Sequence, residues 1–446
     1  MTKKLYIAIL LASSLCLSSC SNFLDIQPVG KVIPNTLEEY RALFTTAYNV
    51  SLIDRSLCDM RTDGITVRKD EYDQNNYGDI EKWADINPSP ETTAFEWGKY
   101  YTNIYYANAI IDKRDEITEG SQEDINQLVG EAYLMRGYMH FLLVNLYGVP
   151  YTKAGAPDTK AVPVKLNLDL EEVPSRNTVG EVYASALADI ASARQLINKK
   201  EWETGYNYRF STLSVDALES RVYLYMGEWQ KAYEAAERVL AQKSTLENFN
   251  EEDSRLPNQY QSVEMITAYE TVYNSGTARA SQATEALIQK FDQNYDLRLS
   301  KYFGEANDDG NYPTQKTDGY SQYRCSFRTG EFYLNAAETA ARLNNLSAAR
   351  ERLLQLMEKR YTPEGYGQKQ KSVNAMTQND LITEILNERT RELIFEGHYW
   401  FDLRRTTRPK LQKVVNGQTY TLEEDDARYT LRIPQDAIDA NPNLMN

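Results

Sequence analysis

Apolar side chains recur at intervals of three and four residues along most of this chain. This spacing is typical of amphipathic α-helices, whose apolar positions share one face. It is clearest in two runs, Ala132, Met135, Met139, Leu142 and Leu146, and then Val182, Ala186, Ile190, Ala193 and Ile197. Thr178 and Glu181 have the spacing of a capping box that would open the second helix. The pattern predicts a mainly all-α fold.

Two stretches have the pattern of helix hairpins with small residues where the helices cross. One contains Ser220, Tyr223, Ala232, Ala236 and Val239, and the other contains Ala337, Ala340, Ala349, Leu353 and Leu356. These spacings are similar to those of tetratricopeptide repeats, in which small residues let neighbouring helices approach. We therefore expect helix pairs within residues 92–242 and 325–405, stacked as an α-superhelix.

Two other regions, 59–91 and 245–323, lack a clean period and are rich in Asn, Asp, Gly and Tyr. Long polar segments that contain aromatics are often functional in a compact protein. Several of their aromatics fit no helical stripe, namely Tyr77, Trp83, Tyr302, Tyr312, Tyr320 and Tyr323. We expect these regions to form a ligand-binding face. In contrast, Trp97, Tyr101 and Tyr105 keep helical spacing and are predicted to lie in the core.

The first residues have the order of a secretory signal. Lys3 and Lys4 precede an apolar stretch that is too short to span a bilayer, and Ser18 and Ser19 precede Cys20. This arrangement resembles a bacterial lipobox. It predicts that residues 1–19 are a lipoprotein signal peptide and that Cys20 becomes a lipidated N-terminus, which attaches the mature chain, residues 20–446, to a membrane.

Composition excludes some functions. The formal net charge of −15 argues against nucleic acid as a ligand, because phosphate backbones bind basic patches. The chain has no glycine-rich phosphate loop and no zinc-protease motif, and residues 305–316 imitate a calcium loop but end in Lys316 instead of glutamate. We expect no metal and no cofactor. Cys58 and Cys325 remain after processing, and the sequence does not decide whether they pair.

The segment NERTRELIFEGHYWFDLRR, residues 387–405, concentrates charge in a predicted helix that runs from Thr377 to about Gly397. Arg389, Glu392 and Glu396 project into the same arc as the apolar residues of that helix. Buried charges need partners, so we predict a structural ion-pair network of these three residues with Arg404 and cations from other helices. The competing interpretation is a glycoside hydrolase that uses carboxylates among Glu388, Glu392, Glu396 and Asp402.

Five stretches resemble, in order, the motifs of the SusD/RagB family of Bacteroidetes outer-membrane lipoproteins. They are Cys20 with Phe23-Leu24-Asp25, GEAYLMRGYMHFLLVNLYGVPY, FRTGEFYLNAAETAARLNN, ERTRELIFEGHYWFDLRR and IPQDAIDANPNLMN. The resemblance covers nearly all of the chain and implies one domain with four tetratricopeptide-like helix pairs under a loop-rich ligand face. It implies no enzyme activity.

The resemblance also implies a partner and a ligand. The partner is a TonB-dependent transporter of the SusC type, over which the lipoprotein sits as a lid on the cell exterior and delivers captured glycan. Part of the family binds peptides, so a peptide ligand is the alternative. Because the family's ligand loops correspond to the two irregular regions, we expect stacking by Trp83, Tyr302 and Tyr320, with Tyr77, Arg68 and Asn76 as further contacts.

Overall fold

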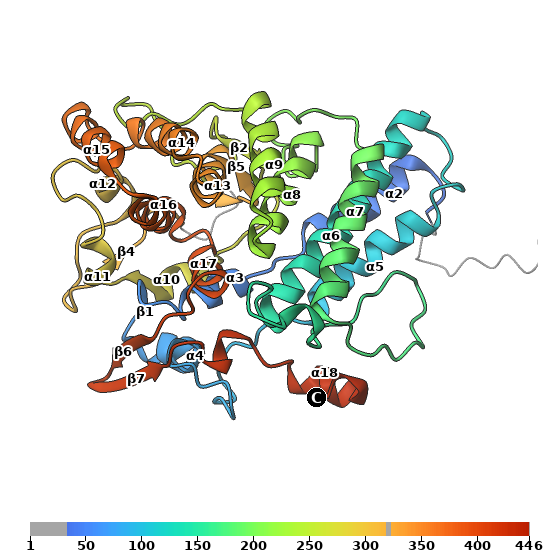
Figure 1. The fold of residues 1–446 in the computed structure, drawn as a ribbon. Helices are drawn as coiled ribbons and strands as arrows, with labels where there is room; N and C mark the ends of the chain where they lie inside the picture. The colour runs from blue at the N-terminus through green and yellow to red at the C-terminus, as the bar shows by residue number, and fades with distance from the viewer. Residues whose placement is uncertain (1–33, 318–322, 446) are drawn as a thin grey trace, which may run out of the picture.

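The computed structural model describes residues 34–317 and 323–445, which are mainly helical as predicted. The long helices pack against one another in a layer that runs from right to left in Figure 1. They are α2 (Leu37–Tyr48), α5 (Gly98–Asp112), α6 (Gln122–Tyr147), α7 (Val179–Leu196), α8 (Thr212–Met226), α9 (Trp229–Gln242), α13 (Thr329–Arg342), α14 (Leu346–Glu358), α15 (Pro363–Ala375) and α16 (Gln378–Leu393). None of the helices in the described ranges is both long enough and apolar enough to cross a bilayer.

Local sequence explains how the helix pairs form. The predicted capping box of Thr178 and Glu181 opens α7. Helices α8 and α9 are joined at Gly227, which adopts φ 76°, a conformation that glycine takes without steric cost. At their crossing the hydroxyl of Ser220 donates to the carbonyl of Ala232 at 3.2 Å, and both residues are buried. The predicted α-superhelix of helix pairs is therefore confirmed.

The two irregular regions lie against each other and contain more regular structure than expected. They contain strand β1 (Ile65–Val67), helix α4 (Glu71–Glu81), strands β2 (Met265–Thr267), β3 (Ser281–Ala283) and β4 (Tyr312–Pro313), and helices α10 (Ser275–Ala280), α11 (Glu285–Ile288) and α12 (Arg298–Tyr302). Antiparallel pairing of Ile65 with Ala283 and of Ala283 with Tyr312 joins three of these strands in the order β1-β3-β4. A second apolar core, separate from that of the long helices, fills this part.

The remaining elements are short. They are α3 (Asp54–Asp59), β5 (Phe327–Arg328), α17 (Tyr399–Arg405), the hairpin β6 (Leu411–Val415) and β7 (Gln418–Leu422), α18 (Gln435–Ala440), and the 3-10 helices η2 (Ala156–Asp158), η4 (Ala427–Tyr429) and η5 (Pro442–Leu444). Strand β5 pairs with β2. In Figure 1, α18 and the C-terminus lie below α5 and α6, outside the stacked helices. No residue of α18 is buried.

Candidate functional site

Two predicted stacking residues lie inside the protein and are corrected here. Trp83 is 1% exposed, and its indole N–H donates to the carbonyl of Arg61 at 2.9 Å. Tyr302 is fully buried and packs edge-on against Phe249. Trp83 belongs to the apolar core of the long helices and Tyr302 to the second core, so neither ring has a free face for a ligand. The prediction is wrong because a segment without helical period can still bury its aromatic rings in a core.

The other predicted ligand contacts are buried, bond to neighbouring residues or lie outside the described part of the chain. Tyr77 is 6% exposed, and the side-chain amide of Asn76 donates to the carbonyl of Tyr72 at 2.8 Å. The carbonyl of Asn76 accepts from the backbone N–H of Thr93 at 2.8 Å, which attaches the following loop to α4. Arg68 is partly exposed and pairs with Asp70 and Asp73 at 3.2 and 3.3 Å. Tyr320 and Cys20 lie outside the described residues.

The predicted ion pairs of Glu392 and Glu396 are present. Glu392 is fully buried and contacts the guanidiniums of Arg298, Arg328 and Arg360 at 2.8–3.1 Å. Five buried cations and five buried carboxylates form the network: Arg298, Lys316, Arg328, Arg360 and Arg391 with Glu264, Asp296, Glu388, Glu392 and Glu396. Equal numbers of opposite charges satisfy the requirement that a buried charge be compensated.

Three details of that network differ from the prediction. Glu396 lies beyond the end of α16, and a turn with positive φ at Phe395 and Gly397 directs it inward. Arg389 pairs with Asp402 at 3.1 Å and donates to Asn335 at 2.6 Å. Arg404 makes no ion pair with any described residue. It donates instead to carbonyls of Asn145, Gly148 and Tyr429, because it lies where the end of α6 meets the C-terminal segment.

The electrostatics of this network do not suit acid–base chemistry. Burial alone would raise the pKa of Glu388, but Arg298 and Arg391 lower it to about 2. The pKa of Glu392 is likewise held well below its ordinary value by Arg360 and Arg328 against the effect of burial. A general acid needs a pKa near the working pH and access to substrate. These carboxylates have neither property, so they give no support to a hydrolase.

The two remaining cysteines do not form a disulfide. Cys58 and Cys325 are both free and buried. Burial raises the pKa of each thiol far above its ordinary value, which keeps both in the neutral form. They therefore behave as small core residues.

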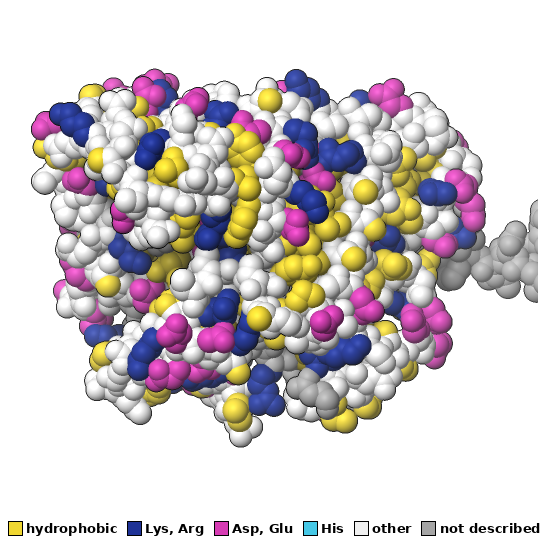
Figure 2. Space-filling view, in the orientation of Figure 1, with side chains coloured by type: hydrophobic (Ala, Val, Ile, Leu, Met, Phe, Trp, Pro, Cys, Tyr) yellow, Lys and Arg dark blue, Asp and Glu magenta, His cyan; other side chains and the backbone are white. Residues whose placement is uncertain are grey.

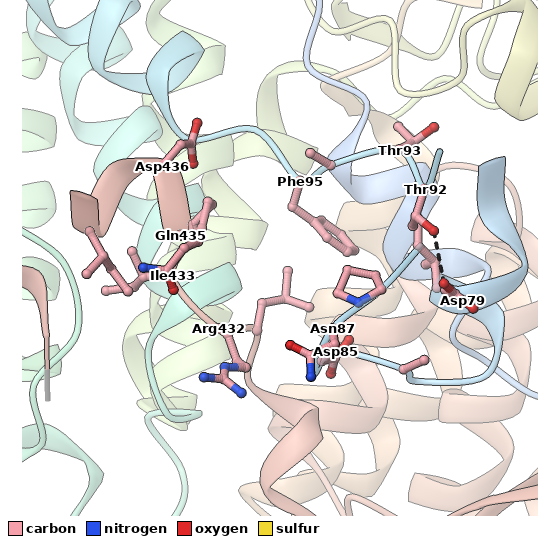
Figure 3. A pocket seen from close by; sticks show the side chains of 17 residues that line it. Asp79, Asp85, Asn87, Thr92, Thr93, Phe95, Arg432, Ile433, Gln435 and Asp436 are labelled. Carbon is pink, nitrogen blue, oxygen red and sulfur yellow. Dashed lines mark hydrogen bonds between the residues drawn. The ribbon is translucent and has the colours of Figure 1, made fainter. Parts of the chain in front are cut away.

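A cleft of about 480 Å³ opens between the loop that follows α4 and the segment that precedes and forms α18. Figure 3 shows Phe95 pointing from the loop into the space between these two segments, with Asn87 and Arg432 along the lower side. We call this space the terminal cleft. Its lining comes from residues 79–95 and 431–438, namely Asp79, Ile80, Ala84, Asp85, Asn87, Pro88, Thr92, Thr93, Ala94, Phe95, Leu431, Arg432, Ile433, Pro434, Gln435, Asp436 and Ile438.

Two acidic residues fix the loop wall of the terminal cleft. Asp79 accepts hydrogen bonds from the backbone N–H of Ser89 at 2.7 Å and from the hydroxyl of Thr92 at 3.1 Å. Partial burial opposes these contacts, but together with Lys82 they lower the pKa of Asp79. Asp85 accepts two hydrogen bonds, at 2.7 and 2.8 Å, from the fully buried Arg61. The loop is therefore held in place before any ligand arrives.

Other groups in the terminal cleft are available to a ligand. The guanidinium of Arg432 and the side-chain amide of Asn87 make no hydrogen bond or ion pair with the described part of the chain. Phe95 is partly buried and contributes an apolar ring. An apolar surface with a few convergent polar groups is typical of small-molecule sites. Sequence reasoning missed Arg432, although its neighbours begin the IPQDAIDANPNLMN stretch.

The aromatic row of α5 was also predicted wrongly in part. Trp97 and Tyr101 are only partly buried, and Tyr105 is 41% exposed. The buried face of α5 is formed instead by Tyr100, Asn103, Ile104, Ala107, Asn108 and Ile110. Helical spacing placed the row on one face correctly, but both faces of this helix carry aromatics.

Surface charge on the viewed face is mixed. In Figure 2, acidic and basic side chains alternate over the surface, without a broad patch of one sign. That distribution gives no support on this face to a polyanionic partner such as nucleic acid.

The chain is similar in sequence and in fold to SusD-like proteins. A SusD-like family model, described as starch-binding and associating with the outer membrane, matches residues 23–224. A SusD-like protein of Formosa agariphila is 24% identical, over 94% of each chain. A SusD superfamily protein from Bacteroides thetaiotaomicron has the same fold, with a TM-score of 0.77 at 22% identity, over 92% of this chain and 99% of that one.

A laminarin-binding SusD-like protein also shares the fold. Its TM-score is 0.63 at 18% identity, over 84% of this chain and 92% of that one. The sequence match, the full-length relative and the shared helical architecture agree with each other and with the motifs of the chain. Membership of the SusD/RagB family is supported by the family-model match over residues 23–224, by the similarity to the SusD-like relative and by the shared fold.

Proposed function

We propose that this protein binds glycan in the terminal cleft. The observation that carries the proposal is the pairing of an apolar ring, Phe95, with two unoccupied polar groups, Asn87 and Arg432, in a cleft whose loop wall is already fixed. Sugar rings present C–H faces to aromatics and hydroxyls to amides and guanidiniums. The family's starch-binding description and the laminarin-binding relative support a carbohydrate ligand.

The wider role is also part of this proposal, and the family similarity and the leader sequence support it. The protein acts as a non-enzymatic lipoprotein, anchored through Cys20 to the outer membrane and facing the cell exterior. It passes captured oligosaccharide to a SusC-like TonB-dependent transporter, over which it sits as a lid. The outer-membrane association in the family description supports this location.

Calorimetric titration of the mature chain with laminarin and with soluble starch tests the binding site. Phe95→Ala should weaken binding of the recognised glycan about two- to tenfold, the range expected for one aromatic contact. Arg432→Ala is the companion variant, since its exposed side chain can be removed without disturbing the core. Tyr206→Ala is the matched control because Tyr206 is 48% exposed and lies outside the cleft.

Two results would contradict the proposal. Unchanged affinity in both Phe95→Ala and Arg432→Ala would exclude the terminal cleft as the site. Binding of mixed peptides by a wild-type chain that binds neither glycan would favour the peptide-capturing alternative.

A further inference from the structure

A second hollow, of about 300 Å³, lies on the other side of the C-terminal segment from the terminal cleft. Helix α18 takes part in both walls: Gln435, Asp436 and Ile438 line the terminal cleft, whereas Ala437 and Ala440 line the hollow. The floor of the hollow is the aromatic row of α5, Trp97, Tyr101 and Tyr105. We call it the aromatic hollow.

The aromatic floor still has hydrogen-bonding capacity. The rings of Trp97 and Tyr101 are 5.2 Å apart, and their planes are tilted by 40°. The hydroxyl of Tyr101 donates to the carbonyl of Pro163 at 2.9 Å, which ties the floor to the opposite loop. Neither the indole N–H of Trp97 nor the hydroxyl of Tyr105 bonds to any described residue. Two donors at the edge of an apolar surface are therefore free.

The loop wall of the aromatic hollow is preformed. The side-chain amide of Asn108 donates to the carbonyls of Lys165 and Asn167 at 3.3 and 3.1 Å. The backbone N–H of Lys165 donates to Nε2 of His140 at 3.2 Å. His140 is fully buried, and burial lowers its pKa to about 3, so the neutral ring serves as the acceptor. A ligand would meet a shaped wall instead of ordering a loop.

The charges around the aromatic hollow favour a neutral ligand. The Lys165 ammonium is engaged by Glu172, and Asp169 also faces the space, so an anionic sugar would meet an uncompensated carboxylate. A volume of about 300 Å³ is at the lower limit for small-molecule sites, which suits a short part of a glycan chain.

We propose that the aromatic hollow is a second glycan site, which stacks neutral sugar rings on Trp97, Tyr101 and Tyr105 and works together with the terminal cleft. This inference rests on the proposed function. Because one short helix separates the two sites, a long chain can occupy both, and the second contact then forms at high effective concentration. The preferred ligand is therefore a polymer or long oligosaccharide.

Calorimetry with short and long glycans tests the second site. Laminaritriose and maltotriose are the short probes, and laminarin and soluble starch are the long ones. The trisaccharide that binds should do so at two sites per wild-type chain and at one site in Tyr105→Ala. The same variant should lose about two- to tenfold in affinity for the polymer. Tyr105→Phe, which keeps the ring, should lose less, and Tyr206→Ala should match wild type.

The outcomes separate the two proposals. If Tyr105→Ala keeps wild-type stoichiometry and affinity while Phe95→Ala weakens binding, the second site is refuted and the terminal cleft stands. If Tyr105→Ala abolishes binding and Phe95→Ala has no effect, the aromatic hollow is the glycan site and the terminal cleft is not. If the folded wild-type chain binds none of the four probes, both proposals fail.

Discussion

Replacing Glu392 with glutamine tests whether the buried network stabilises the fold. The Glu392 carboxylate contacts Arg298, Arg328 and Arg360, each with at most 1% of its side chain exposed. Removing one partner of a buried ion pair costs about 3–5 kcal/mol, because the remaining charge loses its compensation. Other carboxylates stay beside the same guanidiniums, so we expect the lower end, about 3 kcal/mol.

The expected change in melting temperature follows from chain length. The entropy of unfolding is about 2.1 cal/mol/K per residue. For a chain of 446 residues, the melting temperature therefore falls by about 1 °C for each kcal/mol of unfolding free energy that is lost. Glu392→Gln should therefore melt about 3 °C below wild type in differential scanning calorimetry. Glu228→Gln is the control, since Glu228 forms an exposed pair with Lys231 at 3.2 Å, and such pairs contribute roughly 0–1 kcal/mol.

Two observations would refute this reasoning. A melting temperature of Glu392→Gln equal to that of Glu228→Gln would mean that the network does not stabilise the fold. A Glu392→Gln variant as stable as wild type that had lost glycan turnover would assign the carboxylate a catalytic role instead.

Three further predictions concern pH and location. The pKa values of Glu388 and Glu338 are about 2, below the ordinary 4.5. The stability that each carboxylate contributes is therefore present above about pH 4.5 and is lost as the pH falls toward 2. The melting temperature should therefore drop between pH 5 and pH 3, and a constant value would contradict this. Burial raises the pKa of Asp54 to about 7, so its contribution is greatest at acidic pH and declines as the pH rises toward 7. The asparagine of Asp54→Asn does not titrate. The melting temperature of this variant should therefore rise relative to that of wild type between about pH 4.5 and pH 8, and a constant difference between the two would refute the prediction. Cys20→Ala should move the protein from the membrane fraction to the soluble fraction, whereas Cys58→Ala should stay with the membrane; a Cys20→Ala variant that still sediments with membranes would exclude the anchor.

The helices could be predicted from sequence because their determinants are local. The capping box at Thr178 and the apolar stripe of α16 lie within a few turns of the residues that they specify. The inward direction of Glu392 could be predicted for the same reason. Its partners Arg298 and Arg360 lie in other segments of the chain, so a charge balance could be expected but these pairs could not be identified.

The terminal cleft could not be predicted because it depends on two distant segments lying opposite each other. Trp83 was expected at the surface because it follows no stripe, but it is buried beside Lys413 of β6. Arg432 reaches the terminal cleft only because the C-terminal segment lies opposite Phe95. Helical period also does not determine which of two aromatic faces of a helix is buried. For this reason Tyr105, which is exposed, was predicted to lie in the core.

The pairing of β1 with β3 has a consequence for the order in which the chain folds. Ile65 contacts Ala283, so more than 200 intervening residues must be closed into a loop before this sheet exists. Contacts of such high contact order form slowly, since the entropy of loop closure is lost before any pairing is gained. The helical pairs need no such closure and can form early. The sheet of the two irregular regions is therefore expected to mature late in folding, and a chain that ends before residue 281 would leave β1 as an open strand edge.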